Sequence, residues 1–228
     1  MKNLNSYNKE SFVDNFSKTE IYSKLVQDFD IVSFDWSLEP KIRGPMSPTP
    51  RQMRGDRFFN KTAFSAVPFY YINFLLEKNP RAIYDLGCGW NIFKKYIPEV
   101  IGVGAETEKE FADLHDFVDD EYVSGHIDYF ESVFSINALH FCPLSKFSKI
   151  IQDFHSMIKP GGRGFLALNF QRMIDRDPVF QNVSHNNIET YCRNELTKLT
   201  NIKFLVVDIR IDPIEEPMDG NIRLVMEK

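Results

Sequence analysis

The chain has 228 residues, of which 43% are hydrophobic, and this fits one domain with a substantial core. The net charge of −5 argues against a generally basic nucleic-acid-binding protein. The first stretch, MKNLNSYNKESF, has no apolar run typical of a signal peptide, and no stretch reaches the roughly 18 apolar residues of a membrane span. The three cysteines are widely spaced, which favours neither a disulfide framework nor zinc. We therefore expect a cytoplasmic protein with no metal ion and no membrane association.

The N-terminal region has two different patterns. Residues 8–29 place apolar side chains at helical spacings with charges between them, which predicts one or two amphipathic helices. Residues 37–61 are rich in proline and glycine, which predicts an extended connector. Basic residues outnumber acidic ones in this connector, and Arg51, Arg54 and Arg57 recur beside two phenylalanines. Residues 62–78 predict a helix that packs on a sheet, with a kink near Pro68.

From residue 82 onward, short apolar runs alternate with helical stretches. Strands are predicted at 82–87, 100–106, 111–117, 132–141, 163–170, 202–211 and 221–228, and helices at 91–97, 120–130, 145–162 and 185–200. Alternation of this kind predicts a parallel sheet covered by helices. The last two strands are joined by a short Pro/Gly turn, so they should pair antiparallel. The predicted fold class is α/β, a doubly wound, mostly parallel sheet with an antiparallel last strand and an N-terminal extension.

The stretch IYDLGCGWN (83–91) ends the first strand of this sheet with Asp85 and places Gly87 and Gly89 in the next turn. Doubly wound sheets bind ligands at the carboxyl ends of their strands. Glycine lacks a Cβ, so the backbone can turn tightly and come close to a ligand. The stretch therefore predicts a ligand site, and an ordinary tight strand-to-helix turn is the alternative.

Three separated motifs resemble those of class I S-adenosylmethionine-dependent methyltransferases. They are 83–91, YFESVFSINALHF (129–141) and MIKPGGRGFLALN (157–169). The resemblance covers roughly 82–228 and implies the fold, binding of S-adenosyl-L-methionine and methyl transfer. An NAD-binding Rossmann domain is the competitor for the first motif, but it would need a third glycine near Ile92 and does not predict the KPGG turn.

For the methionine part of the cofactor, the resemblance implies contacts from Asp85, Gly87 and Gly89. Cys88, between the glycines, is expected to be a small packing residue beside the cofactor, because no base that would activate its thiol is evident. A later glycine of the motif is replaced by Asn91, a residue type that tolerates unusual backbone angles.

For the ribose and adenine, the resemblance implies acidic residues at the ends of the second and third strands. Gly104 stands where the family has the acid that accepts both ribose hydroxyls, so Glu106 is the expected replacement. After the third strand, either Asp113 or Asp116 is expected to face the adenine amine, and Asp116 is preferred because it lies nearer the strand end. A solvated acidic loop is the alternative for both.

The catalytic candidates are Asn137 and His140, which follow the fourth strand. The resemblance places Asn137 beside both the cofactor and the transferred methyl group. His140 is either a general base or a packing residue. The connector arginines Arg51, Arg54 and Arg57 either bind a substrate phosphate or carboxylate or belong to a solvated loop.

The predicted domains are an N-terminal helical and extended cap (1–80) and a cofactor-binding domain (81–228). Methyl transfer to a small molecule is the first functional expectation. The alternatives are a nucleic-acid or protein acceptor, which the basic connector allows, and a fold that has lost catalysis and serves as a binding or structural module. Gly104 and the short segment between the second and third strands support the last alternative.

Overall fold

The computed structural model describes residues 18–21, 23–24, 30–31, 41–43, 64–65, 67–89, 91–105, 110–139, 141–209 and 222–228. Three short strands, β1 (Asp30–Ile31), β2 (Lys41–Arg43) and β3 (Phe64–Ser65), pair antiparallel. Most of the helices predicted over 8–29 and of the connector predicted over 37–61 lies outside the described residues. The division into a cap and a cofactor-binding domain therefore stays a prediction.

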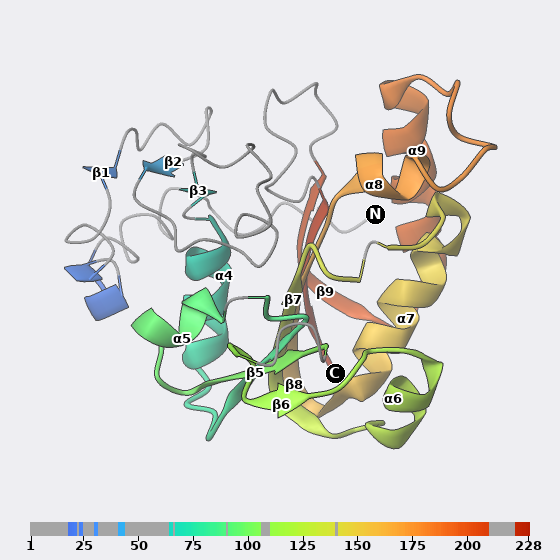
Figure 1. Ribbon diagram of the computed structural model, residues 1–228. Helices are drawn as coiled ribbons and strands as arrows, with labels where there is room; N and C mark the ends of the chain where they lie inside the picture. The colour runs from blue at the N-terminus through green and yellow to red at the C-terminus, as the bar shows by residue number, and fades with distance from the viewer. Residues whose placement is uncertain are drawn as a thin grey trace.

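The described residues form a main sheet of seven strands in the order β6-β5-β4-β7-β8-β10-β9 (Figure 1). The strands are β4 (Ile83–Leu86), β5 (Val100–Gly104), β6 (Leu114–His115), β7 (Phe130–Ile136), β8 (Ile158–Leu168), β9 (Lys203–Ile209) and β10 (Ile222–Glu227). The strands from β6 to β8 pair in parallel, whereas β10 pairs antiparallel with both β8 and β9. The predicted fold class, a doubly wound and mostly parallel sheet with an antiparallel last strand, is confirmed.

Helices cover both faces of this sheet (Figure 1). They are α4 (Val67–Leu76), α5 (Ile92–Tyr96), α6 (Asp120–Gly125), α7 (Phe147–Met157), α8 (Phe170–Ile174) and α9 (His185–Lys198), with a 3₁₀ turn, η3 (Leu144–Lys146), before α7. One face carries α4 and α5, and the other carries α6, α7 and α9. Because each face is covered, the central strands are apolar on both sides, as parallel sheets require.

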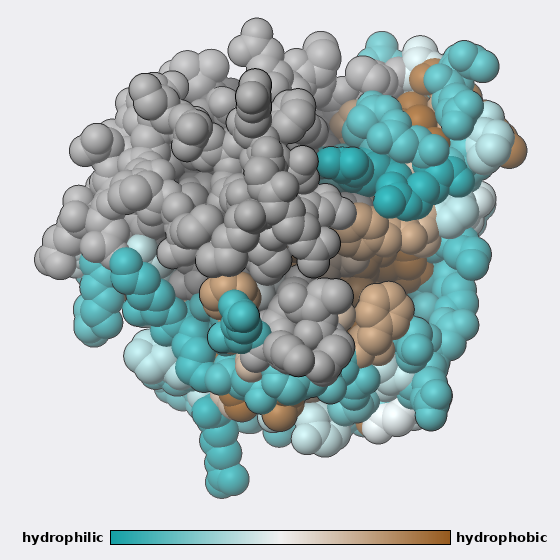
Figure 2. Space-filling view, in the orientation of Figure 1, coloured by the Kyte–Doolittle hydropathy of each residue, from teal (hydrophilic) through white to brown (hydrophobic). Residues whose placement is uncertain are grey.

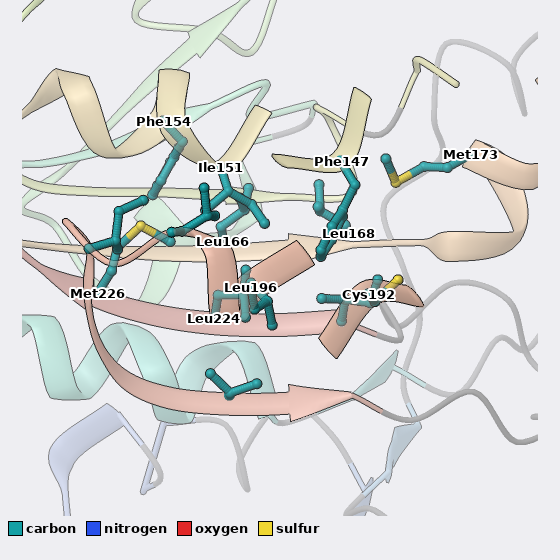
Figure 3. Close-up of a cluster of buried hydrophobic side chains, with 14 of the residues drawn as sticks. Phe147, Ile151, Phe154, Leu166, Leu168, Met173, Cys192, Leu196, Leu224 and Met226 are labelled. Atoms are coloured by element: carbon teal, nitrogen blue, oxygen red, sulfur yellow. The ribbon is translucent and has the colours of Figure 1, made fainter. Parts of the chain in front are cut away.

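The larger core lies between α7, α9 and the strands β8 and β10 (Figure 3). Phe147, Ile151 and Phe154 recur at helical spacing along α7, and all three are fully buried. Each such side chain contributes about 1.5–3 kcal/mol through burial. The second core lies under α4 and α5 and includes Phe74 and Phe134. The prediction that the helix before the first strand packs on the sheet is confirmed.

Several element boundaries differ from the predictions. Helix α4 begins at Val67, so Pro68 lies in the first turn, where its missing N–H is harmless, and the predicted kink is wrong. Helix α7 ends at Met157, because Ile158 is extended and pairs with Phe130 on β7. The Pro-Gly-Gly sequence therefore lies within β8, where Gly161 takes a positive φ of 81°.

Two further differences concern the segments before β7 and after β8. The helix predicted over 120–130 ends at Gly125, and Phe130 already belongs to β7. The predicted strand over 163–170 ends at Leu168, and the five-residue α8 follows directly with Asn169 as its N-cap. A helix this short has too few residues to show a hydrophobic period in the sequence.

Candidate active site

The order of the strands reverses at β4, whose neighbours are β5 on one side and β7 on the other. The carboxyl ends of β4 and β7 therefore flank a topological switch point, the usual ligand site of doubly wound sheets. The hydroxyl of Ser135, near the end of β7, donates to the carbonyl of Leu86 at the end of β4 over 2.8 Å. This hydrogen bond holds the two strand ends together.

The turn after β4 uses its two glycines differently. Gly87 has φ of 79°, and a Cβ placed on it would lie 2.2 Å from the Cβ of Ala138, so close packing against the segment after β7 requires glycine. Gly89 has φ of 53°, and apart from Gly89 itself and its chain neighbours, no atom of the described residues lies within 4 Å of the position that its Cβ would take. The N–H groups of Gly87 and Cys88 both donate to the carbonyl of Val103. The turn is thus anchored to β5, and among the described residues nothing beyond its chain neighbours packs against Gly89 where a Cβ would lie.

Asp85 is 2% exposed and lies between Gly102 of β5 and Phe134 of β7 in the strand register. A buried carboxylate at the end of a strand is costly and occurs mainly where polar partners or a functional site compensate. Cys88 is also buried, and its thiol contacts the carbonyl oxygen of Gly89 at 3.8 Å. The structure brings Asp85, Gly87, Cys88 and Gly89 together at the switch point.

Asn137 follows β7 directly with φ of 53°, and its N–H donates to the carbonyl of Ala167 over 3.0 Å. The contact between Gly87 and Ala138 places this segment against the turn after β4. Asn137 therefore lies at the same strand edge as Asp85, as predicted for a residue beside the cofactor. Its catalytic role stays a prediction.

Asp113 is used for a structural purpose that the sequence did not reveal. One of its carboxylate oxygens accepts from the N–H of Gly102 at 2.8 Å and from the side-chain amide of Asn91 at 2.9 Å. Its other oxygen is hydrogen-bonded to Lys94. Partial burial acts to raise the pKa of Asp113, but the hydrogen bonds from Lys94, Gly102 and Asn91 outweigh it and lower that pKa.

Asn91 has φ of 55°, an unusual backbone angle that asparagine tolerates better than most residues. Its side chain fills the space beside Gly102, where a Cβ would lie 2.6 Å from the Asn91 amide. Asn91, Gly102 and Asp113 thus join the start of α5, the middle of β5 and the start of β6. No single motif in the sequence contains these three positions, so only the fold reveals their relation.

Asp116 lies just past β6, at the carboxyl end of the sheet. Its N–H donates to the carbonyl of Gly104 over 2.9 Å, and its carboxylate accepts from the N–H of Phe117 over 2.8 Å. Asp116 is exposed, and it adjoins the end of β5, where the ribose acid is expected. Because Asp113 is already engaged, Asp116 is the better candidate of the two for an adenine contact.

Several predicted site residues lie outside the described residues. They are Glu106, His140, Arg51, Arg54 and Arg57. Strand β5 itself ends at Gly104 without a carboxylate. The predicted replacement of the ribose acid by Glu106, and the predicted roles of His140 and the three arginines, remain predictions.

Within the described residues, no group of three or more His, Cys, Asp or Glu side chains is arranged to hold a metal ion. Cys88, Cys142 and Cys192 do not form disulfides with one another. No helix among the described elements is both long and apolar enough to cross a membrane.

Comparison with models of known protein families finds no match, and no curated protein matches. A SAM-dependent methyltransferase from Archaeoglobus fulgidus is 15% identical, with 72% of this chain and 92% of that chain covered and a TM-score of 0.46. The fibrillarin pre-rRNA processing protein of Methanococcus jannaschii is 12% identical, with 88% and 97% covered and a TM-score of 0.45. An O-methyltransferase family protein from Burkholderia thailandensis is 13% identical, with 72% and 56% covered and a TM-score of 0.42.

At TM-scores below 0.5, these likenesses are too distant to bear on function. The strand order, with its parallel strands and antiparallel closing pair, is the class I methyltransferase-like fold expected from the three motifs. The chain therefore has the general architecture of an S-adenosylmethionine-dependent methyltransferase.

Proposed function

We propose that the protein binds S-adenosyl-L-methionine at the turn after β4 and transfers its methyl group to a small molecule. The observation that supports this most strongly is that the described residues leave the side of Gly89 open, next to the buried Asp85, at the switch point of the sheet. A Cβ at position 89 would fill the space in which a ligand could approach the backbone. The residues present therefore fit the cofactor at this end of the site.

When bound, the cofactor would supply a methyl group on a positively charged sulfur. A lone pair of the acceptor would form the new bond to this methyl group as the C–S bond breaks. The electrons of the C–S bond would stay on sulfur, which gives S-adenosylhomocysteine. The task of the protein is then to align the acceptor with the methyl group and to exclude water. Asn137 and His140 follow β7, where acceptor and cofactor would meet. In this proposal Asn137 orients the reacting groups, and His140 takes the proton that the acceptor loses.

The rest of the cofactor would extend toward β5 and β6. Asp116 adjoins the end of β5 through its hydrogen bond to Gly104, which suits a contact to the adenine amine. Glu106 is proposed to take the ribose hydroxyls in place of an acid at position 104. The arginines of the connector, within the proposed cap of residues 1–80, are proposed to contact the acceptor. The net charge of −5 favours a small-molecule acceptor over nucleic acid.

A second candidate function is a ligand-binding or structural module without catalysis. It is favoured by β5, which ends in Gly104 rather than in an acid, and by β6, which has only two residues, Leu114 and His115. Replacing Glu106 by Gln separates the two functions. Loss of cofactor affinity in Glu106→Gln would support the active enzyme, whereas unchanged affinity would favour the module without catalysis.

The proposed function is tested by calorimetric titration of the full chain with S-adenosylmethionine and with S-adenosylhomocysteine. Binding of both in the micromolar range is expected, with a rise in melting temperature, since a ligand at about 100 times its Kd stabilises the native state by about 2.7 kcal/mol. Absence of heat and of a melting shift at millimolar concentrations would overturn the proposal.

A further inference from the structure

Two segments that follow neighbouring strands meet at the edge of the candidate site. Strands β7 and β8 are parallel and pair Ile136 with Ala167, so the segments after them begin at the same edge of the sheet. One segment runs from Asn137 through Phe141 to η3, and the other begins at Asn169 and forms α8. Side chains from both segments are therefore available to a molecule bound beside the cofactor.

Hydrogen bonds in the second segment fix the backbone of Arg172 and the side chain of Arg176. The side-chain oxygen of Asn169 accepts from the N–H of Arg172 over 3.2 Å, which sets the first turn of α8. The guanidinium of Arg176 donates to the carbonyl of Arg172 over 2.9 Å. The same guanidinium lies over the ring of Phe141, 5.1 Å from its centroid. This cation–π contact connects the segment after β8 to the segment after β7.

Both arginines are exposed, and neither forms an ion pair with a carboxylate of the described residues. Three other arginines of the described residues do form ion pairs: Arg163 with Glu227, Arg193 with Glu189 and Arg223 with Asp208. An arginine fork without a carboxylate can bind a carboxylate or phosphate through two hydrogen bonds.

The acidic residues next to these arginines are engaged elsewhere. Asp175 accepts from the side-chain amide of Gln171 over 2.9 Å. Asp177 is buried, and its two oxygens accept from the N–H groups of Ser145 at 2.8 Å and Val179 at 3.2 Å. The hydrogen bond between Ser145 and Asp177 holds η3 and the end of the α8 segment together, and neither Asp175 nor Asp177 forms an ion pair with Arg172 or Arg176.

A third cation belongs to the same region. Lys146, at the end of η3, is exposed and has no ion pair among the described residues. Burial raises the pKa of the Cys142 thiol to about 11, while the positive charges of Lys146 and Arg176 both act in the opposite direction. Lys146 and Cys142 belong to the same segment between β7 and α7, and the hydrogen bond from the N–H of Ser145 to Asp177 ties the η3 turn of Lys146 to the segment that carries Arg176.

Phe141, whose ring lies under the guanidinium of Arg176, is 62% exposed. Large aromatic side chains are usually buried, so an exposed ring beside unpaired guanidinium groups is informative. Figure 2 shows hydrophobic surface directly below the hydrophilic surface of α8, over the segment that joins β7 to α7. A planar ring can stack on such a surface while an attached anionic group reaches the cations.

We propose that Phe141, Lys146, Arg172 and Arg176, here called the acceptor platform, bind the acceptor of the reaction, and that this acceptor is a small aromatic molecule carrying a carboxylate or phosphate group. The assignment rests on the proposed methyl transfer, because it places the acceptor at the carboxyl ends of β7 and β8. Phe141 stacks on the ring, and Arg172 and Arg176 hold the anionic group.

The test uses benzoate, phenyl phosphate and the neutral benzamide as probes, with binding followed by NMR titration of the full chain, with and without S-adenosylhomocysteine. One or both anions are expected to bind in the millimolar range, and benzamide about tenfold more weakly or not at all. Tighter binding of phenyl phosphate would identify the anionic group as phosphate, and tighter binding of benzoate would identify it as carboxylate.

The variant Arg172→Gln/Arg176→Gln is expected to bind the better anion about tenfold more weakly than wild type, and Phe141→Leu to weaken all ring probes. Arg193→Gln on α9 is the matched control, since it removes an exposed arginine elsewhere, and it should bind the anion like wild type. Equal affinity for benzamide and the anions, unchanged affinity in the double variant, or no anion binding at about 10 mM would overturn the proposal.

Affinity for S-adenosylhomocysteine is measured on the same samples. If the double variant keeps wild-type affinity for S-adenosylhomocysteine but loses the anion, the platform is an acceptor site separate from the cofactor site. If wild type binds the anion but not S-adenosylhomocysteine, the proposed methyl transfer is overturned, and so is the assignment of the platform to an acceptor. The platform would then remain an anion-binding site.

Discussion

Gly87 and Ala138 form the contact between the turn after β4 and the segment after β7: a Cβ on Gly87 would lie only 2.2 Å from the Cβ of Ala138. This approach places the two loops of the switch point directly against each other. The glycine is therefore required by packing, in addition to its positive φ of 79°.

Gly87→Ala is expected to destabilise the protein by about 2–4 kcal/mol, since it combines a disfavoured backbone conformation with a clash against Ala138. Urea unfolding measures the loss. Adding Ala138→Gly should recover part of it, because the clash is removed while the backbone strain remains. Wild-type stability in Gly87→Ala, or no recovery in the double variant, would contradict this interpretation of the contact.

Gly89→Ala is expected to affect ligand binding more than folding. Its φ of 53° makes alanine strained by about 1 kcal/mol, but no described atom obstructs the new methyl group. The methyl group would enter the proposed cofactor space, so the affinity for S-adenosylhomocysteine should fall about tenfold or more in calorimetry.

Gly161→Ala is the matched control for Gly89→Ala. Gly161 also has a positive φ, of 81°, and open space around the position of a Cβ, but it lies at the start of β8, at the opposite end of that strand from the site. It should show a similar stability loss with unchanged affinity. Equal losses of affinity in the two variants would show that strain, not the ligand space, causes the effect.

Asp113→Ala is expected to cost about 1–3 kcal/mol of stability, because the N–H of Gly102 and the side-chain amide of Asn91 lose their acceptor. Asp113→Asn should cost less, since one acceptor oxygen remains. Hydrogen exchange at the Gly102 amide should accelerate in Asp113→Ala.

Asp116→Ala is expected to weaken cofactor binding while leaving stability nearly unchanged, which is the reverse of the effect expected for Asp113→Ala. Its side chain is exposed, so stability should change by no more than about 0.5 kcal/mol. Its proposed adenine contact predicts weaker binding of S-adenosylhomocysteine. If Asp113→Ala, with its fold intact, lost the cofactor more severely than Asp116→Ala, the roles assigned to the two acids would have to be exchanged.

Glu227 makes folding stability depend on pH. Its hydrogen bond with Lys203 lowers the pKa of this carboxyl from 4.5 to about 2; partial burial opposes the shift and a second hydrogen bond from Arg163 adds to it. Because the folded pKa lies below the unfolded one, the stabilisation is complete above pH 5 and is lost as the pH falls from about 4.5 to about 2. It amounts to about 2–3 kcal/mol at neutral pH.

Urea unfolding of wild type and Glu227→Gln at a series of pH values measures this contribution. The difference between the two proteins should be largest at neutral pH and shrink below pH 4.5. Glu77→Gln is the control, since the Glu77 side chain is 55% exposed and lies 3.7 Å from Arg163. A difference between wild type and Glu227→Gln that stayed constant down to about pH 2 would contradict the assignment.

The sequence predicted the sheet well because alternation of apolar runs and helical stretches is a local signal. The seven strands of the main sheet and the antiparallel closing pair were all expected. Boundaries were less predictable where one residue type fits two structures. Ile158 suits a helix as well as a strand, and its pairing with Phe130 decides between them.

The site was predictable in its motif but not in its supporting contacts. Asp85, Gly87 and Gly89 are adjacent in the chain, so one motif predicted them together. The Gly102 N–H donates a hydrogen bond to Asp113, and Gly87 packs against Ala138. Both contacts form only after β5, β6 and β7 have been brought to one edge of the sheet. Asp113 was a possible cofactor contact in the sequence analysis because its hydrogen bonds to Gly102, Asn91 and Lys94 depend on the fold.

The most direct test of cofactor binding at the turn after β4 is an NMR titration of the ¹⁵N-labelled full chain with S-adenosylhomocysteine. The amide signals of Gly89, Asn137 and Asp116 are expected to shift together and saturate in the micromolar range, while Gly161 at the other end of the sheet stays unchanged. Shifts confined to residues away from the carboxyl ends of β4, β5 and β7, or no shifts at millimolar ligand, would contradict it.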